Sequence, residues 1–199
     1  MHEQLILASA SSARARILVA AGLDFRVEPA AIDEEAVKRA FKAEAAAAVD
    51  CALALAEAKA RRISGRHPSA LVVGADQILV CDGVWFDKPA DIAEARTQLR
   101  SLRGRRHELV TGACVVTAGE RIWHGVSRPR LAMRAFSDEY LDAYLAAEGS
   151  AILGSVGAYR IEGRGIQLFT GIDGDYFAVL GLPLFALLAF LRDRGALPR

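Results

Sequence analysis

The sequence has few cysteines, and their placement excludes the simplest cysteine-based structures. Only Cys51, Cys81 and Cys114 are present among 199 residues, odd in number and far apart. Such spacing gives neither a disulfide framework nor the paired ligands of a zinc site. We therefore expect three buried thiols in a protein of a reducing compartment, the cytoplasm.

A surplus of charge of either sign is also missing. The chain has 25 Lys and Arg residues against 24 Asp and Glu residues, a net charge of +1. Proteins that bind nucleic acid or an anionic membrane usually carry a marked positive surplus. We expect neither partner, so an anionic ligand would have to be bound by local positive charge.

A long hydrophobic run is absent from the N-terminal sequence. MHEQLILASASSARAR has about five apolar residues before its serines begin, too few for a signal peptide core or a membrane span. The length of the chain suits one domain over residues 1–199, with a sizeable core and room for two lobes around a cleft.

Strand and helix signals alternate along the chain, which predicts an α/β fold with a twisted mixed sheet flanked by helices. Strands are predicted at residues 4–8, 25–29, 69–80 and 84–86, and as hairpins after residue 106 with a turn at 118–120. Helices are predicted from Ser11 or Ser12 to Gly22, within 34–63, at 92–102, from Ser137 to 147, and at 184–194. We interpret the alanines of residues 34–63 as helix filler.

Residues 154–184 mix strand-like apolar runs with glycines and charged side chains. Gly157, Gly163 and Gly165 bracket one carboxylate, Glu162. Because glycine within a strand marks a bulge or the close approach of a ligand, we expect one wall of a cleft here. A glycine-bent antiparallel hairpin without a ligand is the alternative.

Serines and arginines gather where the first predicted strand meets the first predicted helix. Ser9, Ser11, Ser12, Arg14 and Arg16 lie within eight residues. Free N–H groups at a helix N-terminus attract anions, and hydroxyl and guanidinium groups add donors, so this turn predicts a phosphate site. The alternative is a serine cap followed by solvated arginines.

Two polar residues, Asp76 and Gln77, interrupt the apolar strand at 69–80. A buried carboxylate is costly unless it is paired, bound to metal or exposed to a cleft. The end of a strand over a cleft is a common place for catalytic groups. The alternative is a structural Asp76 that accepts backbone N–H bonds.

Glu34, Lys59 and Lys88 have no evident role in packing. Carboxylates can hold Mg²⁺ and orient water, and lysines can neutralise the charge of phosphate. Taken singly, each lysine is more typical of a solvated surface charge.

In this order, the segments LASASSARARIL, GADQ, FDKP, LRGRRHELVTG and GAYRIEGRGIQLF, followed by GDYFAVLGLPL, resemble the Maf family of nucleoside triphosphate pyrophosphatases. The resemblance covers nearly the whole chain. It implies a two-lobed Maf/ITPase-like α/β fold with the active cleft between the lobes, commonly dimeric. It also implies Mg²⁺- or Mn²⁺-dependent cleavage between the α and β phosphates of a nucleotide, which releases pyrophosphate.

Matched by position, the resemblance assigns roles to particular residues. Asp76 corresponds to the catalytic carboxylate that binds metal and activates water, Glu34 to a second acidic metal ligand, and Lys88 to a catalytic lysine that faces phosphate. Three further positions correspond to residues that bind the phosphates of the substrate: Ser9, Arg14 and Lys59.

Three positions bear on the choice of base. Gln77 and Glu162 look like the subgroup that acts on 7-methyl-GTP, whereas the dTTP/UTP subgroup has Thr and Gln there. Ala13 stands where the family's first motif has arginine and the 7-methyl-GTP subgroup has tryptophan, and Ser12 replaces the motif's proline. This chain therefore lacks that aromatic platform for the base.

The chemistry of Glu162 favours guanine independently of the resemblance. A carboxylate only accepts hydrogen bonds, which suits the adjacent N1–H and N2–H₂ donors of guanine, whereas glutamine both donates and accepts. We expect 7-methyl-GTP or another guanine-type nucleotide as substrate. The alternatives are dTTP/UTP, ITP/XTP, and a nucleotide-binding regulator of cell division without turnover.

Overall fold

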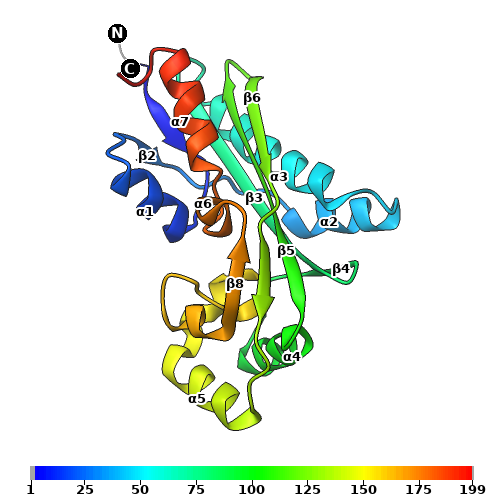
Figure 1. Ribbon diagram of the computed structural model, residues 1–199. Coiled ribbons are helices and arrows are strands. Elements are labelled where there is room, and N and C mark those ends of the chain that lie inside the picture. Colours follow the sequence, from blue (N-terminus) through cyan, green and yellow to red (C-terminus); the bar gives the residue numbers. More distant parts are fainter. Residues whose placement is uncertain (1–2, 199) are drawn as a thin grey trace. The chain divides into compact units, whose positions relative to one another are not determined.

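The computed structural model describes residues 3–198, and they form a mixed α/β structure (Figure 1). Eight strands of the described residues pair in the order β2-β1-β3-β5-β7-β8, with β4 on β3 and β6 on β5. The strands are β1 (Leu5–Leu7), β2 (Arg26–Val27), β3 (Leu71–Cys81), β4 (Val84–Phe86), β5 (Arg106–Thr117), β6 (Glu120–Ser127), β7 (Arg130–Met133) and β8 (Phe169–Asp173). The predicted α/β class with a mixed sheet is confirmed.

Seven α-helices lie between and after these strands in the described residues. They are α1 (Ser12–Ala20), α2 (Glu34–Ala43), α3 (Ala48–Ser64), α4 (Ile92–Leu102), α5 (Asp138–Glu148), α6 (Tyr176–Val179) and α7 (Leu184–Asp193). The predicted caps are confirmed, since Ser11, Asp91 and Ser137 each accept a backbone N–H bond in the first turn of a helix. No helix of the described chain is both long and apolar enough to span a membrane.

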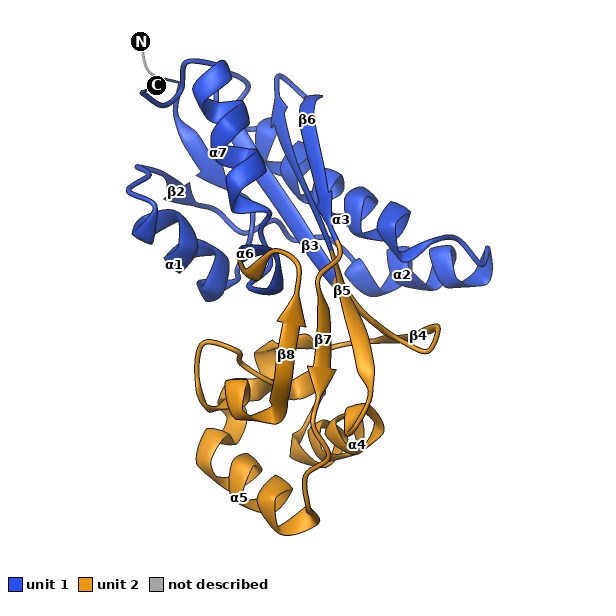
Figure 2. Cartoon of the chain, in the orientation of Figure 1, with its two compact units in different colours: residues 1–77, 111–127, 177–199 blue, residues 78–110, 128–176 orange. Residues whose placement is uncertain are grey.

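The chain folds into two compact units (Figure 2). Unit 1 comprises the chain up to Gln77, Thr111–Ser127, and the chain from Phe177 onward. Unit 2 comprises Ile78–Val110 and Arg128–Tyr176. The cleft between lobes that the family resemblance implies stays a prediction.

In unit 1, helices cover both faces of a buried sheet. Strand β1 pairs in parallel with β2 and β3, and β5 pairs antiparallel with β6. Alternate residues of each strand point to opposite faces. Side chains of α1 and α7 pack on one face, with Leu5, Leu7, Leu71 and Val73, and side chains of α3 pack on the other, with Ile6, Ala8 and Val72.

Helix α3 lies unusually close to the sheet because the facing residues are small. Ala52, Ala56 and Ala60 are fully buried on one face of the helix. A Cβ atom on Gly74 of β3 would lie 2.0 Å from the carbonyl oxygen of Ala56, and one on Gly112 of β5 would lie 2.9 Å from the backbone nitrogen of Leu53. The interpretation of these alanines as helix filler is therefore wrong, because they form the contact surface of α3.

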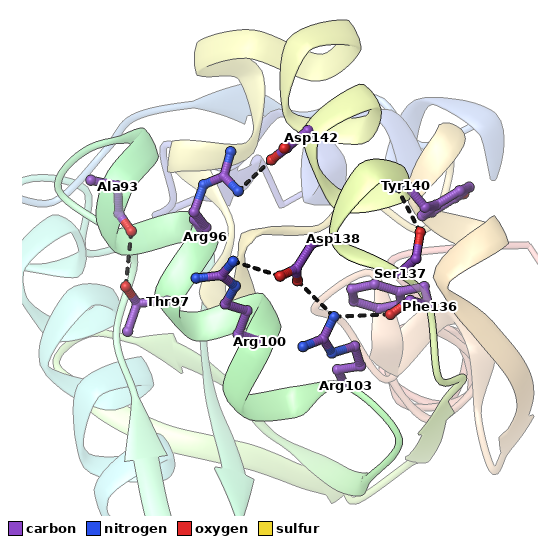
Figure 3. A network of polar contacts seen from close by, with 10 residues as sticks. All are labelled: Ala93, Arg96, Thr97, Arg100, Arg103, Phe136, Ser137, Asp138, Tyr140 and Asp142. Carbon is purple, nitrogen blue, oxygen red and sulfur yellow. Dashed lines mark hydrogen bonds and ion pairs between the residues drawn. The ribbon is translucent and has the colours of Figure 1, made fainter.

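In unit 2, ion pairs join α4 to α5. Arg100 and Arg103 each approach Asp138 at 2.8 Å, and Arg96 pairs with Asp142 (Figure 3). Asp138 is the first residue of α5, where its negative charge also interacts favourably with the positive end of the helix dipole. Such exposed pairs are individually weak, so their effect depends on the network as a whole.

The strand-like interpretation of residues 154–184 is wrong for most of the segment. A 3₁₀ turn at Gly149–Gly154 leads into the segment, whose first half forms two more at Val156–Ala158 and Arg164–Leu168, and only Phe169–Asp173 is a strand, paired with β7. The glycines close tight turns: Gly157 has a φ of 77°, and a Cβ on Gly165 would lie 2.4 Å from the carbonyl oxygen of Arg160. The alternative of a glycine-bent hairpin is wrong for the same reason.

All three cysteines are buried and free, as the sequence predicts. Burial raises the pKa of Cys114 to about 12, so this thiol stays protonated at neutral pH. We conclude that Cys114 belongs to the core and not to a reactive site.

A buried histidine makes the stability of unit 2 sensitive to acid. Burial lowers the pKa of His107 to about 4, whereas an unfolded chain protonates histidine near pH 6.5. Its ring Nε2 lies 2.8 Å from the Tyr159 hydroxyl, and its Nδ1 has no hydrogen bond within the described residues. As pH falls, the folded state therefore takes up a proton at the His107 ring only at a lower pH than the unfolded state does.

We predict that the stabilising contribution of neutral His107 is complete above pH 6.5 and is lost as pH falls towards 4. Urea unfolding at pH 7 and pH 4 should show that wild type loses about 3 kcal/mol more over this range than His107→Phe does. His124→Phe, which changes an exposed histidine, is the matched control and should keep the wild-type pH dependence. Equal pH dependence in wild type and His107→Phe would contradict the prediction.

Candidate active site

A buried lysine brings two carboxylates together in unit 1. The Nζ of Lys59 lies 2.5 Å from Oδ1 of Asp76 and 2.8 Å from Oε1 of Glu34. Lys59 is 6% exposed and Asp76 is 5% exposed, while the Glu34 side chain is 39% exposed. The interpretation of Lys59 as a solvated charge is wrong, and the expectation that Asp76 is paired is confirmed.

Local structure explains why these three side chains meet. Lys59 lies on the buried face of α3, next to Ala60 and one turn from Ala56. Gly74 and Asp76 share one face of β3, because side chains two apart in a strand point the same way. The close approach of α3 at Gly74 therefore brings the end of Lys59 to Asp76.

Glu34 reaches the same lysine from the start of α2. Asp33 caps this helix, since its Oδ1 accepts the backbone N–H of Ala36 at 2.9 Å. The cap fixes Glu34 as the first helical residue. Its carboxylate also lies in the first turn of α2, at the positive end of the helix dipole.

One oxygen of Asp76 is buried without a partner. Its Oδ1 is bound to Lys59, whereas its Oδ2 has no hydrogen bond within residues 3–198. No backbone N–H of the described chain donates to this carboxylate, so the alternative of a purely structural Asp76 is not supported. A buried carboxylate oxygen without a partner is costly unless a ligand contacts it.

The two carboxylates fit a divalent cation of the magnesium type. The described residues contain no cluster of three or more His, Cys, Asp or Glu side chains that could hold a metal by themselves. Mg²⁺ is usually held by one or two carboxylates together with phosphate oxygens of the substrate. Asp76 and Glu34, with one Asp76 oxygen unpartnered, match that type of site.

Arg14 points into the protein and not into solvent. It is 8% exposed, its Nε donates to the carbonyl oxygen of Gly181 at 2.7 Å, and its NH1 donates to Oγ of Ser9 at 3.0 Å. Ser11 caps the same helix by accepting the backbone N–H of Arg14 at 3.4 Å. The alternative of solvated arginines therefore fails for Arg14 and holds for the exposed Arg16.

The charges of the site act on Arg14 as well. Burial lowers the pKa of the Arg14 guanidinium, and the negative charges of Asp76 and Glu34 raise it. Arginine remains protonated in proteins even when it is buried. The region therefore keeps two positive groups, Arg14 and Lys59, beside two carboxylates.

Gln77 points to the opposite face of β3 from Asp76. Its Nε2 lies 2.8 Å from Oγ1 of Thr111, 2.8 Å from the carbonyl oxygen of Ala178 and 3.2 Å from that of Val179. Because carbonyl oxygens only accept hydrogen bonds, the side-chain atom that faces these two must be the NH₂ group, which fixes the orientation of the Gln77 amide. Gln77 is thus left with its Oε1, an acceptor, as the end available to a ligand.

The remaining predicted residues are less enclosed. Ala13 is half-buried in α1, in unit 1. Lys88 follows β4 and is exposed, and Glu162 is exposed between two 3₁₀ turns, with its Oε1 3.8 Å from Nε of Arg160; both belong to unit 2. The approach of Lys88 and Glu162 to the Asp76 cluster stays a prediction.

The sequence alone did not single out Gly74, Thr111 or Gly181 as residues of the site. Each acts through a contact with a residue distant in sequence, so the residues next to it in the sequence give little indication of its role. Gly181 is the clearest case, since a glycine that follows a short helical segment can mark a left-handed turn, and its φ is 101°.

Comparisons with known proteins show the family to which this chain belongs. The family model described as "Maf-like protein" matches residues 4–194. A nucleoside triphosphate pyrophosphatase of Granulibacter bethesdensis is 55% identical, over 98% of each chain, and one of Paramagnetospirillum magneticum is 53% identical, over 96% of this chain and 99% of its own. A 7-methyl-GTP pyrophosphatase of Rhizobium meliloti is 46% identical over 99% of each chain.

We predict that Lys59→Met destabilises the protein by about 3–5 kcal/mol, because it leaves the buried Asp76 carboxylate without a counter-charge. Urea unfolding at pH 7 measures the loss, and the added substitution Asp76→Asn should restore part of it. Lys42→Met, at an exposed lysine of α2, is the matched control and should change stability by about 0.5 kcal/mol at most. The prediction fails if the two lysine variants are equally stable.

Proposed function

Because the chain belongs to the Maf family, it is an enzyme of the nucleoside triphosphate pyrophosphatase class, and we propose that it acts on a guanine-type nucleotide such as 7-methyl-GTP. The reaction cleaves the bond between the α and β phosphates and releases the monophosphate and pyrophosphate. The observation that carries the proposed chemistry is the buried Asp76, paired with Lys59 through one oxygen and unpartnered at the other.

In this proposal Asp76 and Glu34 hold a divalent cation, Mg²⁺ or Mn²⁺. When bound, the cation neutralises phosphate charge and makes the phosphorus more open to attack. Asp76 uses its unpartnered Oδ2 to orient the attacking water and to accept its proton. Lys59 keeps both carboxylates in place through its two ion pairs.

Positive groups stabilise the phosphates in the same proposal. Arg14 and Ser9 form a donor pair at the start of α1, where the helix dipole also favours an anion. Lys88 contributes from unit 2 and stabilises the leaving pyrophosphate. Fixed donors of this kind need no reorganisation as negative charge develops, which makes them effective in catalysis.

We predict that Asp76→Asn keeps the fold and lowers kcat about a hundredfold or more, because asparagine can still accept from Lys59 but cannot act as a base. The measurement is pyrophosphate release with Mg²⁺ or Mn²⁺, with thermal melting to check the fold. Wild-type activity should also disappear when EDTA removes the metal. Asp24→Asn, at an exposed aspartate of unit 1, is the control. An Asp76→Asn variant with normal turnover would remove Asp76 from the mechanism.

The choice of base depends on acceptor groups in this proposal. Glu162 is exposed, and its carboxylate can accept both N1–H and N2–H₂ of guanine. Gln77 is oriented to offer a second acceptor, its Oε1. The relative from Rhizobium meliloti that is named 7-methyl-GTP pyrophosphatase supports the same class of base. A 7-methylated guanine carries a positive charge, which a carboxylate attracts further.

We predict that Glu162→Gln reduces the preference for guanine-type nucleotides over UTP by about tenfold to a hundredfold, the value of one charge-assisted hydrogen bond. Pyrophosphate release is compared across UTP, dTTP, CTP, GTP, 7-methyl-GTP and ITP. Glu148→Gln is the matched control, because Glu148 is also a carboxylate beside Arg160, at 4.0 Å. Unchanged relative rates in Glu162→Gln would exclude the proposed role.

The same panel separates the other candidate functions. Faster release from UTP or dTTP would keep the reaction and exclude the proposed base, and faster release from ITP would indicate a deaminated purine. Intact triphosphate after long incubation with either metal would favour a nucleotide-binding regulator. The relatives named as pyrophosphatases favour turnover. A homodimer and a cytoplasmic location remain proposals.

A further inference from the structure

A turn near the C-terminal end of the chain holds the guanidinium of Arg14. The carbonyl oxygen of Gly181 accepts from Nε at 2.7 Å across 167 residues of sequence, and this bond is buried. Together with the bond to Ser9, it occupies two of the five N–H groups of Arg14. The others make no hydrogen bond within the described residues, so they can bind an anion.

Only glycine fits at position 181. Its φ of 101° lies in the region that other residues avoid. A Cβ there would also lie 3.0 Å from Nε and 3.3 Å from NH2 of Arg14. A side chain at this position would therefore strain the backbone and push the guanidinium away from its present place.

The turn that carries Gly181 is fixed to two strands of unit 1. The carbonyl oxygen of Ala178 accepts from Nε2 of Gln77 at 2.8 Å, from Oγ1 of Thr111 at 2.9 Å and from the backbone nitrogen of Gly181 at 3.0 Å. Gln77 and Thr111 belong to β3 and β5. The turn after α6 is thus held to the strand that carries Asp76.

We propose that Gly181 is a positioning residue for the pyrophosphatase reaction, which aims Arg14 at the phosphates of the nucleotide. The turn held by Gln77 and Thr111 fixes the Gly181 carbonyl, and this carbonyl fixes the plane of the guanidinium. Gly181 itself touches no substrate and acts only through Arg14. This role rests on the proposed function, because the phosphates are the anion that Arg14 meets.

The test is a double-mutant cycle with Gly181→Ala and Arg14→Ala. Gly181→Ala should lower kcat/KM about tenfold to a hundredfold, as expected for misplacing one charge-assisted donor. In the Arg14→Ala background the same substitution should change kcat/KM no further, because the side chain through which it acts is gone. A merely structural role would lower kcat/KM in both backgrounds.

Gly195→Ala is the matched control. Gly195 has a φ of 78°, and a Cβ there would meet nothing within 4 Å. The substitution therefore carries comparable backbone strain without contact to Arg14, and kcat/KM should stay within about twofold of wild type. If Gly181→Ala does not fold, Thr111→Val takes its place, because it removes one donor to the Ala178 carbonyl, and a smaller loss is expected in the same cycle.

Calorimetry with inorganic pyrophosphate gives a readout that does not need turnover. Gly181→Ala should weaken pyrophosphate binding nearly as much as Arg14→Ala does. Wild-type kcat/KM in Gly181→Ala, or an equal further loss in the Arg14→Ala background, would overturn the proposal. A wild type that hydrolyses no nucleotide contradicts the proposed function instead. In that case the binding measurement alone tests the role of Gly181. The role is excluded if wild type and Gly181→Ala bind pyrophosphate equally, or if wild type does not bind pyrophosphate.

Discussion

The close packing of α3 on β3 is the contact on which the rest of the site depends. Where Gly74 meets the backbone at Ala56, no side chain separates helix from strand. This short distance allows Lys59, on the buried face of α3, to reach Asp76 with its terminal amine. A larger residue in place of Gly74 would move α3 away from β3 and break the buried ion pair between Lys59 and Asp76.

Alternating charge is the second feature of the site. Lys59 lies between Asp76 and Glu34, and the same two carboxylates act on the buried Arg14. Charges in a protein interior are costly unless they are paired, so this arrangement is a poor way to gain stability. It is a suitable way to hold a metal and a chain of phosphates, since both need fixed charges of opposite sign within a few ångströms.

Neighbouring residues of β3 serve different parts of this arrangement because a strand presents alternate side chains to opposite faces. Asp76 faces α3 and its lysine, whereas Gln77 faces the turn after α6 and holds the Ala178 carbonyl. That turn carries Gly181, which in turn contacts Arg14 at the start of α1. Segments from the beginning, middle and end of the chain thus meet at one strand.

The sequence by itself determined the elements that depend on local signals. The caps at Ser11, Asp91 and Ser137, the apolar strand β3 and the hairpin of β5 with β6 all follow from residues a few positions apart. Tertiary structure decided the rest: the burial of Lys59, the inward direction of Arg14 and the 3₁₀ turns in place of strands before β8. Lys59 meets a partner 17 residues away and Arg14 one 167 residues away, and no local pattern encodes such contacts.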